Sequence, residues 1–471
     1  MYLEKLIKLR DENKNICLLG YGKEIQQFHV WLNEVVGYKN ENIVIADKNK
    51  VEIKDVKIFS GDNYLDVLDE DYGMVFKAPG LWSLNPSLVN YRERNGADSI
   101  HSSLVFFFEK YRNNMIMITG TKGKTTTSNW CKHFLTNSDV NKKIEYCGNT
   151  TNISPYQFWT ELENTNDKYY FVIEVSSFQL QDLGTSNISP KNSIITNLYI
   201  DHLDQHNNKV EYWNAKDNIF KYQFTSDSLT ITEQVLGNII ERKVDLKSKF
   251  EIVKLADIEE FKSKYKLSLL GDHNWSNMIL ALKAIQKIAN VSNNNVTLQQ
   301  IMDTFEPPKG RLELIKTVQI SGVSVTFYND NTATEPDAVV AALKALATQK
   351  DSKTILFISG KWKNGNHAKL SEEIKIQFES KCLSRVYYFG EVGQKLYSLI
   401  NGKDQDFISF KNFLADETEF LDDLNSISSS KQTNINVLFS PSGSSFDEFI
   451  NYIERGDKYL DWINRIDNSV K

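Results

Sequence analysis

The chain has 471 residues, enough for two to four domains at about 150 residues each, and 41% are hydrophobic and 25% charged. The formal net charge of -6 argues against a protein devoted to nucleic acid, because phosphate backbones require a surplus of Lys and Arg. The charged N-terminus, the absence of a CxxC pair and the lack of an apolar run near the ~20 residues of a membrane span predict a cytoplasmic protein without a secretory signal.

The first predicted unit, residues 15–32, is a short apolar strand that leads into a G-Y-G turn and then a helical pattern. The next predicted strand, NIVIAD, ends at Asp47. Glycines at the first turn and an acid at the end of the following strand are typical of a dinucleotide-type βαβ unit. Ile25 replaces the third glycine of that motif, so a plain strand–helix turn without a ligand stays an equal alternative.

A second strand-to-loop pattern, MIMITGTKGKTTTSNW, occupies residues 115–130. The loop G-T-K-G-K-T-T is two residues shorter between its glycines than the general phosphate-binding motif of ATP- and GTP-binding proteins. Its glycines allow backbone amides to turn toward an anion, and the helix that follows directs its positive end there. We expect Lys124 to neutralise nucleotide phosphates and Thr125 to bind Mg²⁺. A loop without a ligand is the alternative.

Three candidate side chains follow this loop. Glu174 ends the apolar strand of FVIEVSSFQL, where a carboxylate can reach a metal beside a nucleotide. His202 and His206 stand four residues apart, a spacing that can bind zinc on a helix, but two ligands do not close a zinc site. Lys216 lies in a helical pattern, EYWNAKDNIF, where a lysine is ordinarily solvated.

The rest of the chain continues the alternation of strands and helices. Up to about residue 305 this alternation favours a parallel α/β sheet. FEPPKGRLE, residues 305–313, carries two prolines and a glycine and is expected to be a linker. Two further strand-to-glycine-loop patterns follow, at residues 353–365 and 436–449.

In this order, the G-T-K-G-K-T loop, the E-V-S-S-F-Q-L strand and the D-H-L-D box resemble the Mur ligase superfamily, whose members form amide bonds in cell-wall precursors. Residues 329–343 and 440–459 resemble its D-glutamate-adding members. The resemblance implies an α/β fold of three domains: an N-terminal Rossmann-like domain for a UDP-sugar, a central parallel-sheet domain for ATP and a C-terminal Rossmann-like domain for the amino acid. These domains are expected at residues 1–112, 113–308 and 309–471.

The resemblance also implies an activity. The chain would be a monomeric, cytoplasmic ligase of peptidoglycan synthesis, and so of cell-wall biogenesis, cell shape and cell division. It would use ATP and two Mg²⁺ to join D-glutamate to UDP-N-acetylmuramoyl-L-alanine through an acyl phosphate, with no nucleic-acid or membrane partner. The alternatives are a ligase for L-glutamate or another amino acid, a folylpolyglutamate synthase, and a nucleotide-binding regulator without catalysis.

The positions of this sequence that match the motifs of the family imply the residues of each site. The implied catalytic residues are Lys124, Glu174, His202 and Lys216, of which Lys216 matches a lysine that the family carbamylates. The implied metal ligands are Thr125, Glu174, His202 and Lys216. The implied ATP-binding residues are Gly120, Thr121, Lys122, Gly123, Lys124, Thr125, Thr126, Asn274, Arg311 and Asp330. The implied UDP-sugar-binding residues are Gly22, Asp47, Gly80 and Asn149, and the implied glutamate-binding residues are Thr334, Lys363, Ser445 and Tyr452.

The amino-acid site departs from the family pattern. Members commonly read N-D-S-K-A-T where this chain reads N-D-N-T-A-T, so Thr332 replaces a lysine. A loop that often carries D-G-K reads K-W-K at residues 361–363. Glutamate brings two carboxylates that require a cation, so we expect Lys363 to meet them, with Lys361 as the next candidate. A surface loop whose lysines face solvent is the alternative.

Overall fold

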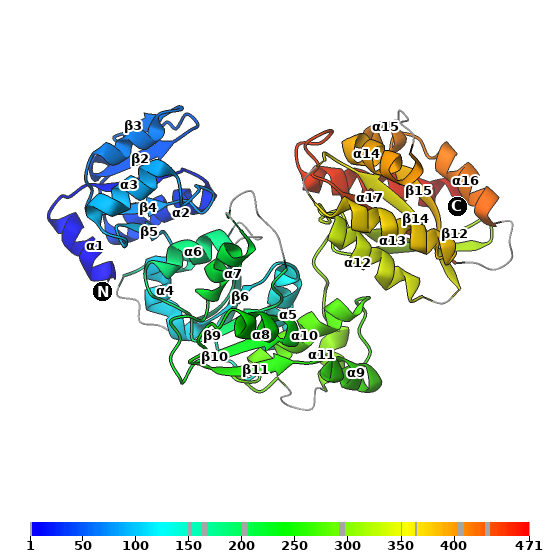
Figure 1. Cartoon of the computed structure of the whole chain (residues 1–471), viewed down its shortest axis with the longest axis horizontal. Helices are drawn as coiled ribbons and strands as arrows, with labels where there is room; N and C mark the ends of the chain where they lie inside the picture. Colours follow the sequence, from blue (N-terminus) through cyan, green and yellow to red (C-terminus); the bar gives the residue numbers. More distant parts are fainter. Residues whose placement is uncertain are drawn as a thin grey trace. The chain divides into compact units, whose positions relative to one another are not determined.

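The computed structural model describes residues 2–148, 153–162, 168–199, 206, 208–291, 297–349, 351–362, 365–402, 409–428 and 434–470. Their strands form three sheets, each with helices packed on it (Figure 1). The chain divides into two compact units, Met1–Lys266 with Ser276–Phe305 and Leu267–Trp275 with Glu306–Lys471. The N-terminal and central sheets belong to the first unit and the C-terminal sheet belongs to the second.

The N-terminal sheet has the order β3-β2-β1-β4-β5, with all strands parallel. Its strands are apolar on both sides because each face is covered: Ile16 and Leu18 of β1 lie in one core, and Cys17 and Leu19 lie in the other. Its strands are β1 (Ile16–Leu19), β2 (Ile43–Asp47), β3 (Lys57–Ser60), β4 (Met74–Lys77) and β5 (Ile100–Ser102). The helices of this part are α1 (Tyr2–Asp11), α2 (Lys23–Trp31), α3 (Pro86–Asn95) and α4 (Val105–Tyr111).

The central sheet has the order β11-β10-β9-β6-β8-β7, again all parallel. Strand β6 lies between β8 and β9, so their carboxyl ends meet at one edge of the sheet. The strands are β6 (Met115–Thr119), β7 (Lys143–Gly148), β8 (Tyr169–Glu174), β9 (Asn192–Ile195), β10 (Ser228–Thr232) and β11 (Lys249–Val253). The helices are α5 (Lys124–Thr136), α6 (Ser177–Gly184), α7 (Lys209–Asp217), α8 (Glu233–Glu241), α9 (Leu255–Lys264), α10 (Asp272–Ile285) and α11 (Leu298–Asp303).

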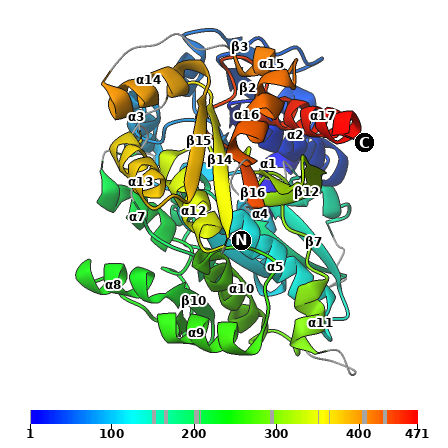
Figure 2. The same cartoon turned by 90° about the vertical axis from the view of Figure 1, so that its right-hand side faces the viewer.

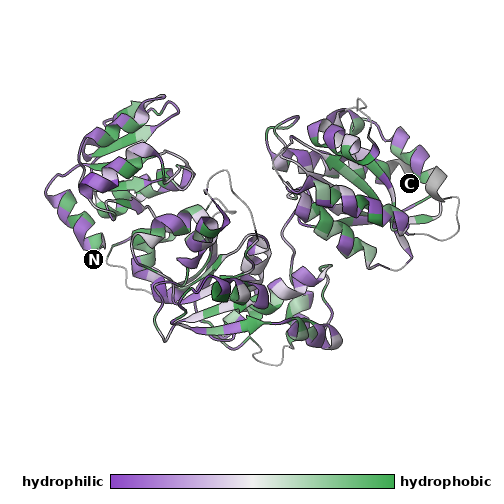
Figure 3. Ribbon diagram, viewed as in Figure 1, coloured by the Kyte–Doolittle hydropathy of each residue, from purple (hydrophilic) through white to green (hydrophobic). Residues whose placement is uncertain are grey.

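An aromatic cluster joins the N-terminal and central sheets. The ring of Trp31, at the end of α2, lies 4.6 Å from that of Tyr156 and 4.8 Å from that of Trp159, centroid to centroid. Phe107 of α4 in turn lies 4.7 Å from Phe171 of β8. Such pairs contribute about 0.5–1.5 kcal/mol each beyond the apolar area they bury. One apolar core therefore extends from the N-terminal sheet to the central sheet, whose strands are largely hydrophobic in Figure 3.

The C-terminal sheet has the order β12-β13-β16-β14-β15, in which only the edge strand β12 is antiparallel to its neighbour among the described strands. Two apolar cores cover its faces, one with α12, α13 and α14 and the other with α15, α16 and α17 (Figure 2). The strands are β12 (Glu313–Ile320), β13 (Val323–Asn329), β14 (Ser352–Ser359), β15 (Leu383–Tyr388) and β16 (Asn434–Ser442). The helices are α12 (Pro336–Ala347), α13 (His367–Glu379), α14 (Gly390–Asn401), α15 (Phe410–Phe413), α16 (Thr418–Ser428) and α17 (Tyr452–Val470).

The three α/β sheets confirm the fold class expected from the sequence. The expected linker, residues 305–313, contains the change from the first unit to the second, after Phe305, and no helix or strand before Glu313. The domain limits at 112/113 and 308/309 stay predictions. Within the described part of the chain, no helix combines the length and the apolar character that a membrane crossing requires.

Candidate active site

The glycine-rich loop between β6 and α5 has a backbone shape that only glycine permits at two positions. Gly120 has φ +146°, and a Cβ atom there would lie 1.9 Å from Thr196 Oγ1. Gly123 has φ +81°, and a Cβ atom there would lie 2.5 Å from Asn277 Oδ1. Both the left-handed φ and the close neighbours exclude larger residues. The spacing of glycines in the loop is therefore explained by its geometry.

Residues that follow β9 hold this loop in place. Asn197 accepts hydrogen bonds from the amides of Thr121, at its carbonyl (3.0 Å), and of Lys122, at its side-chain oxygen (2.9 Å). The Thr196 hydroxyl donates to the carbonyl of Lys122 at 2.6 Å, and the Tyr199 amide donates to the Thr121 hydroxyl at 2.9 Å. The sequence analysis did not assign these bracing residues. Only their position in the sequence could have indicated this role, because they directly follow β9, which neighbours β6.

Two lysine side chains meet at one backbone carbonyl of the loop. Lys124 Nζ donates to the carbonyl oxygens of Gly120 (2.9 Å) and Thr121 (3.0 Å). Lys216 of α7, only 1% exposed, donates to the same Gly120 oxygen at 3.0 Å and lies over the ring of Tyr212. The structure thus brings together two residues that the sequence separates widely. Two adjacent ammonium groups at a loop of this shape form a strongly attractive place for an anion.

Glu174 lies at the same edge of the central sheet. It ends β8 and pairs in register with Ile118, next to the strand residue from which the loop departs. Its side chain is 1% exposed, and its carboxylate accepts a hydrogen bond from the Tyr146 hydroxyl at 2.9 Å. A buried carboxylate is stable only with hydrogen bonds or a cation beside it. The role of Glu174 as a metal ligand stays a prediction.

The described part of the chain does not test the predicted metal ligand His202. His202 lies outside the described residues, as does Asn149. His206 is buried, with Nε2 3.1 Å from Ser177 Oγ and its ring stacked on that of Phe178. Among the described residues there is no group of three or more His, Cys, Asp or Glu side chains that could hold a metal ion.

The other predicted nucleotide residues lie in the second unit. Asp330 follows β13 and is buried, and its carboxylate accepts hydrogen bonds from the Leu312 amide (3.0 Å) and the Ser440 hydroxyl (2.7 Å). Burial raises the pKa of Asp330 to about 7, and these two hydrogen bonds and Arg311 act in the opposite direction. Asn274, at the start of α10, donates to the Leu270 carbonyl at 2.7 Å.

The predicted glutamate residues lie on loops that Arg455 of α17 holds together. Its buried guanidinium donates to the side-chain and backbone oxygens of Asn331 (2.9 and 3.1 Å) and to the Gly443 carbonyl (3.1 Å). The loop after β13 carries Thr334 and the loop after β16 carries Ser445. The structure therefore brings these two loops together, and Arg455 was not assigned from the sequence. The remaining members of the predicted set are Tyr452, whose carbonyl accepts from the Asn331 side chain, and Lys363, which lies outside the described residues.

Three predicted UDP-sugar residues, Gly22, Asp47 and Gly80, lie at two turns of the N-terminal sheet. The Asp47 carboxylate accepts hydrogen bonds from the amides of Tyr21 (2.5 Å) and Asn49 (2.7 Å), so it shapes the first turn. Gly20, at φ +77°, allows this turn to approach the second, because a Cβ atom there would lie 2.8 Å from that of Ala78. Gly22 and Gly80 have open space where a side chain would stand. Gly20 therefore also belongs to the first turn, although the sequence analysis did not assign it to the UDP-sugar site.

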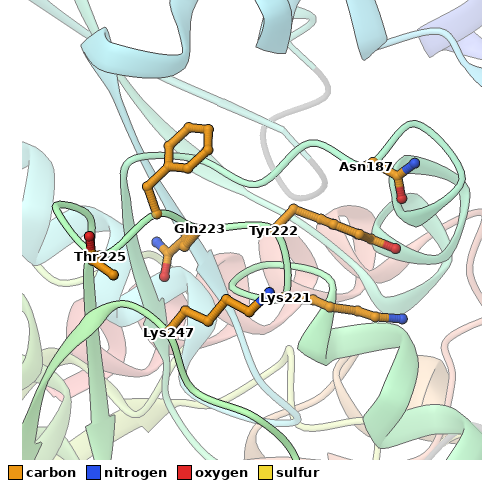
Figure 4. A pocket seen from close by; sticks show the side chains of 7 residues that line it. Asn187, Lys221, Tyr222, Gln223, Thr225 and Lys247 are labelled. Carbon is orange, nitrogen blue, oxygen red and sulfur yellow. The ribbon is translucent and has the colours of Figure 1, made fainter.

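A surface hollow of about 450 Å³ also lies in the first unit (Figure 4). None of its lining residues was predicted to belong to the site. They are Asn187, Lys221, Tyr222, Gln223, Phe224, Thr225 and Lys247.

Residues 118–285 match the Mur ligase middle domain, the segment that contains the loop, Glu174 and Lys216. A UDP-N-acetylmuramoylalanine--D-glutamate ligase of Clostridium tetani is 25% identical to this chain, over 96% of the chain and 97% of that protein. The chain contains a Mur ligase middle domain. A second ligase of the same name, from Acetivibrio thermocellus, is 27% identical over 98% of both chains. The crystal structure of MurF ligase from Thermotoga maritima in complex with ADP has a similar fold, with a TM-score of 0.53, 13% identity and coverage of 96% of this chain and 94% of that chain.

Replacement of Gly120 by alanine should destabilise the first unit by about 1–3 kcal/mol, the usual cost of forcing extra atoms into packed structure. The new methyl group would overlap the Thr196 hydroxyl at 1.9 Å. Gly22→Ala is the matched control, since Gly22 has φ -73° and open space around the added atom. Thermal unfolding followed by circular dichroism would measure both. Equal melting temperatures for the two variants would contradict the geometry of the loop.

Asp330 should make stability depend on pH. Its pKa is about 7 in the folded chain, whereas aspartate in an unfolded chain has a pKa of about 4. The folded state binds this proton more tightly, so the resulting stabilisation is complete below about pH 4 and is lost as the pH rises through about 7. Asp330→Asn cannot titrate. The melting temperature of the wild type relative to this variant should therefore fall from about pH 5 to about pH 7.5 and then level off. A difference that is independent of pH would show that Asp330 is already ionised at low pH.

Proposed function

We propose that this protein uses ATP to join D-glutamate to UDP-N-acetylmuramoyl-L-alanine, a step in the synthesis of peptidoglycan precursors. The meeting of Lys124 and Lys216 at the Gly120 carbonyl carries the proposal, because phosphoryl transfer depends on positive charge placed around the transferred group. The choice of substrates is supported by the relatives named as D-glutamate ligases, which align with nearly the whole chain.

The loop fits the phosphates of ATP. Gly123 precedes the first turn of α5 and has no side chain that could cap the helix, so an anion can approach the positive helix end. Lys124 begins α5 with its ammonium folded over the loop. Thr121, Lys122, Thr125 and Thr126 complete the proposed phosphate site. In the second unit, Asn274, Arg311 and Asp330 are proposed to bind the nucleoside.

The residues beside the loop fit Mg²⁺. Glu174 offers a buried carboxylate, and the Thr125 hydroxyl is the expected ligand from the loop. His202 is proposed for a second ion. Bound Mg²⁺ would neutralise the phosphate oxygens and polarise the γ-phosphoryl group.

Lys216 fits the proposed carbamylation. A carbamate forms on the neutral amine of a lysine, and a buried site favours the uncharged form of such a group in general. Lys216 is buried and shares its carbonyl partner with Lys124. Carbamylation would replace one of two adjacent positive charges with an oxygen ligand, which suits a magnesium site.

The proposed chemistry follows from these positions. The alanyl carboxylate attacks the γ-phosphorus, ADP leaves, and an acyl phosphate forms. Lys124 moves from the Gly120 carbonyl to the phosphate oxygens and stabilises their charge. The glutamate amine then attacks the acyl carbon, and inorganic phosphate leaves. Lys363, Thr334, Ser445 and Tyr452 are proposed to orient glutamate, and Gly22, Asp47, Gly80 and Asn149 are proposed to hold the UDP-sugar.

A product assay tests the proposal. The wild-type chain is incubated with ATP, Mg²⁺, UDP-N-acetylmuramoyl-L-alanine and either D- or L-glutamate, and the products are weighed by mass spectrometry. We expect one added glutamate from the D-isomer and none with Lys124→Ala, whose fold should be intact because the side chain, at the start of α5, is only partly buried. A product from L-glutamate instead would favour the L-specific alternative. ATP binding without any ligation would favour a regulator.

Lys216→Ala should lose nearly all ligase activity, because it removes the proposed carbamate. Short carboxylic acids added to the assay should restore part of it, since a carboxylate can supply the missing oxygen ligand. Lys221→Ala, which changes an exposed lysine of the same part of the chain, is the matched control and should be unaffected by the acids. An inactive Lys216→Ala enzyme that no carboxylic acid rescues would argue that the amine itself is needed.

Lys363→Ala should raise the KM for glutamate at least tenfold and leave the KM for ATP nearly unchanged, because a charged hydrogen bond contributes about 1.5–3 kcal/mol. Lys361→Ala serves as the comparison. Lys361 bridges to Ser444 through its backbone, and that bond survives the substitution. A normal glutamate KM in Lys363→Ala, with a raised value in Lys361→Ala, would move the role to Lys361.

A further inference from the structure

Helix α6 connects the edge of the central sheet that carries Glu174 with the N-terminal sheet. It begins three residues after Glu174, and Ser176 and Gln179 form a capping box at its start. It packs against β5 of the N-terminal sheet (Figure 1). Gln179 and Asp182 are one helical turn apart and therefore lie on the same face. Both are buried, and both bind residues next to the proposed UDP-sugar turns.

Asp182 holds the second of these turns through Lys77. The side chain of Lys77 is fully buried at the end of β4, with Nζ 2.8 Å from Asp182 Oδ2. The same ammonium donates to the carbonyl oxygens of Ala78 (3.1 Å) and Leu81 (2.8 Å), on either side of Gly80. Asp182 also accepts a hydrogen bond from a hydroxyl beyond the turn, that of Ser83, at 3.1 Å. One carboxylate therefore fixes both ends of the turn.

Gln179 holds the first turn through Glu24. Glu24 lies in the first turn of α2, two residues after Gly22. Its carboxylate accepts hydrogen bonds from the Gln179 amide at 2.7 Å and the Ser103 hydroxyl at 2.6 Å. Burial raises the pKa of Glu24, while these two hydrogen bonds lower it. The Glu24 carboxylate is thus buried in the protein and bound to α6.

Adhesion between the two sheets does not require these polar contacts. The aromatic cluster of Trp31, Tyr156 and Trp159 already joins them. Removing a lysine and an aspartate from water costs several kcal/mol per ion, and apolar replacements of a buried pair are often as stable. What a polar bridge adds over apolar contact is direction, because hydrogen bonds restrict both distance and angle.

We infer that Gln179 and Asp182 of α6 are positioning residues. Through Glu24 and Lys77, they set the positions of both UDP-sugar turns relative to the end of β8 that carries Glu174. The inference rests on the proposed function. One substrate must reach from these turns to the phosphate loop, so an error of about 1 Å in their relative position would misplace the alanyl carboxylate. The bridges therefore act on the binding of the UDP-sugar and not on the binding of ATP.

The test compares two double variants with the wild type. Lys77→Met with Asp182→Asn removes both charges of the pair together, so neither is left buried without the other. We expect the KM for UDP-N-acetylmuramoyl-L-alanine to rise at least tenfold and the KM for ATP to change less than twofold. Arg112→Met with Asp227→Asn is the matched control. It removes another partly buried ion pair of the same unit that touches neither turn, and it should leave both KM values unchanged.

A second pair of variants keeps the test decisive if the first double variant does not fold. Glu24→Ala should raise the KM for the UDP-sugar, and Glu24→Gln, which retains an acceptor oxygen and nearly the same volume, should restore most of the affinity. Unchanged UDP-sugar KM values would overturn the inference, as would equal increases for both substrates, which indicate a general structural role. Wild-type chain that forms no product would instead overturn the proposed function, and the inference with it.

Discussion

The turn at Gly120 is the constraint on which the candidate active site depends. Strand β6 ends between β8 and β9, so the chain leaves the sheet where Glu174 and Thr196 also stand. The Thr196 hydroxyl occupies the space of a Cβ atom, and the carbonyl of the turn then faces Lys124 and Lys216. A side chain at this position would displace the carbonyl and disturb both lysine contacts at once. The glycine thus determines where positive charge collects.

The Gly120 carbonyl gathers two lysine side chains at one place on the loop. Lys216 is shielded from water, and electrostatic interactions are stronger in such surroundings than in solvent. Positive charge collected at a glycine-rich turn attracts anions such as phosphate. The turn and the two lysines therefore form one arrangement that suits the proposed phosphate site.

The order of strands, glycine loops and helices could be predicted from the sequence because apolar runs and glycine spacing are local properties. The positions of Lys124, Glu174 and Lys216 followed from motifs. Contacts between distant residues carried no such signal: Asn197 and Lys122 are 75 residues apart, Gln179 and Glu24 155, and Arg455 and Asn331 124. The motif around Asp47 did not indicate that its carboxylate accepts hydrogen bonds from the amides of Tyr21 and Asn49. Asn149, His202 and Lys363 stay predictions.

The three proposed ligand sites share one physical device. A cationic side chain donates to backbone carbonyls of the ligand loop: Lys77 to Ala78 and Leu81, Lys124 and Lys216 to Gly120, and Arg455 to Asn331 and Gly443. Each of these carbonyls is thereby held at a fixed place, and the backbone of the loop that carries it is held with it. Burial lowers the pKa of Arg455 to about 10, so this guanidinium stays charged at neutral pH and keeps its three donors in place. In all three loops, therefore, a cationic side chain fixes the backbone that would surround the ligand.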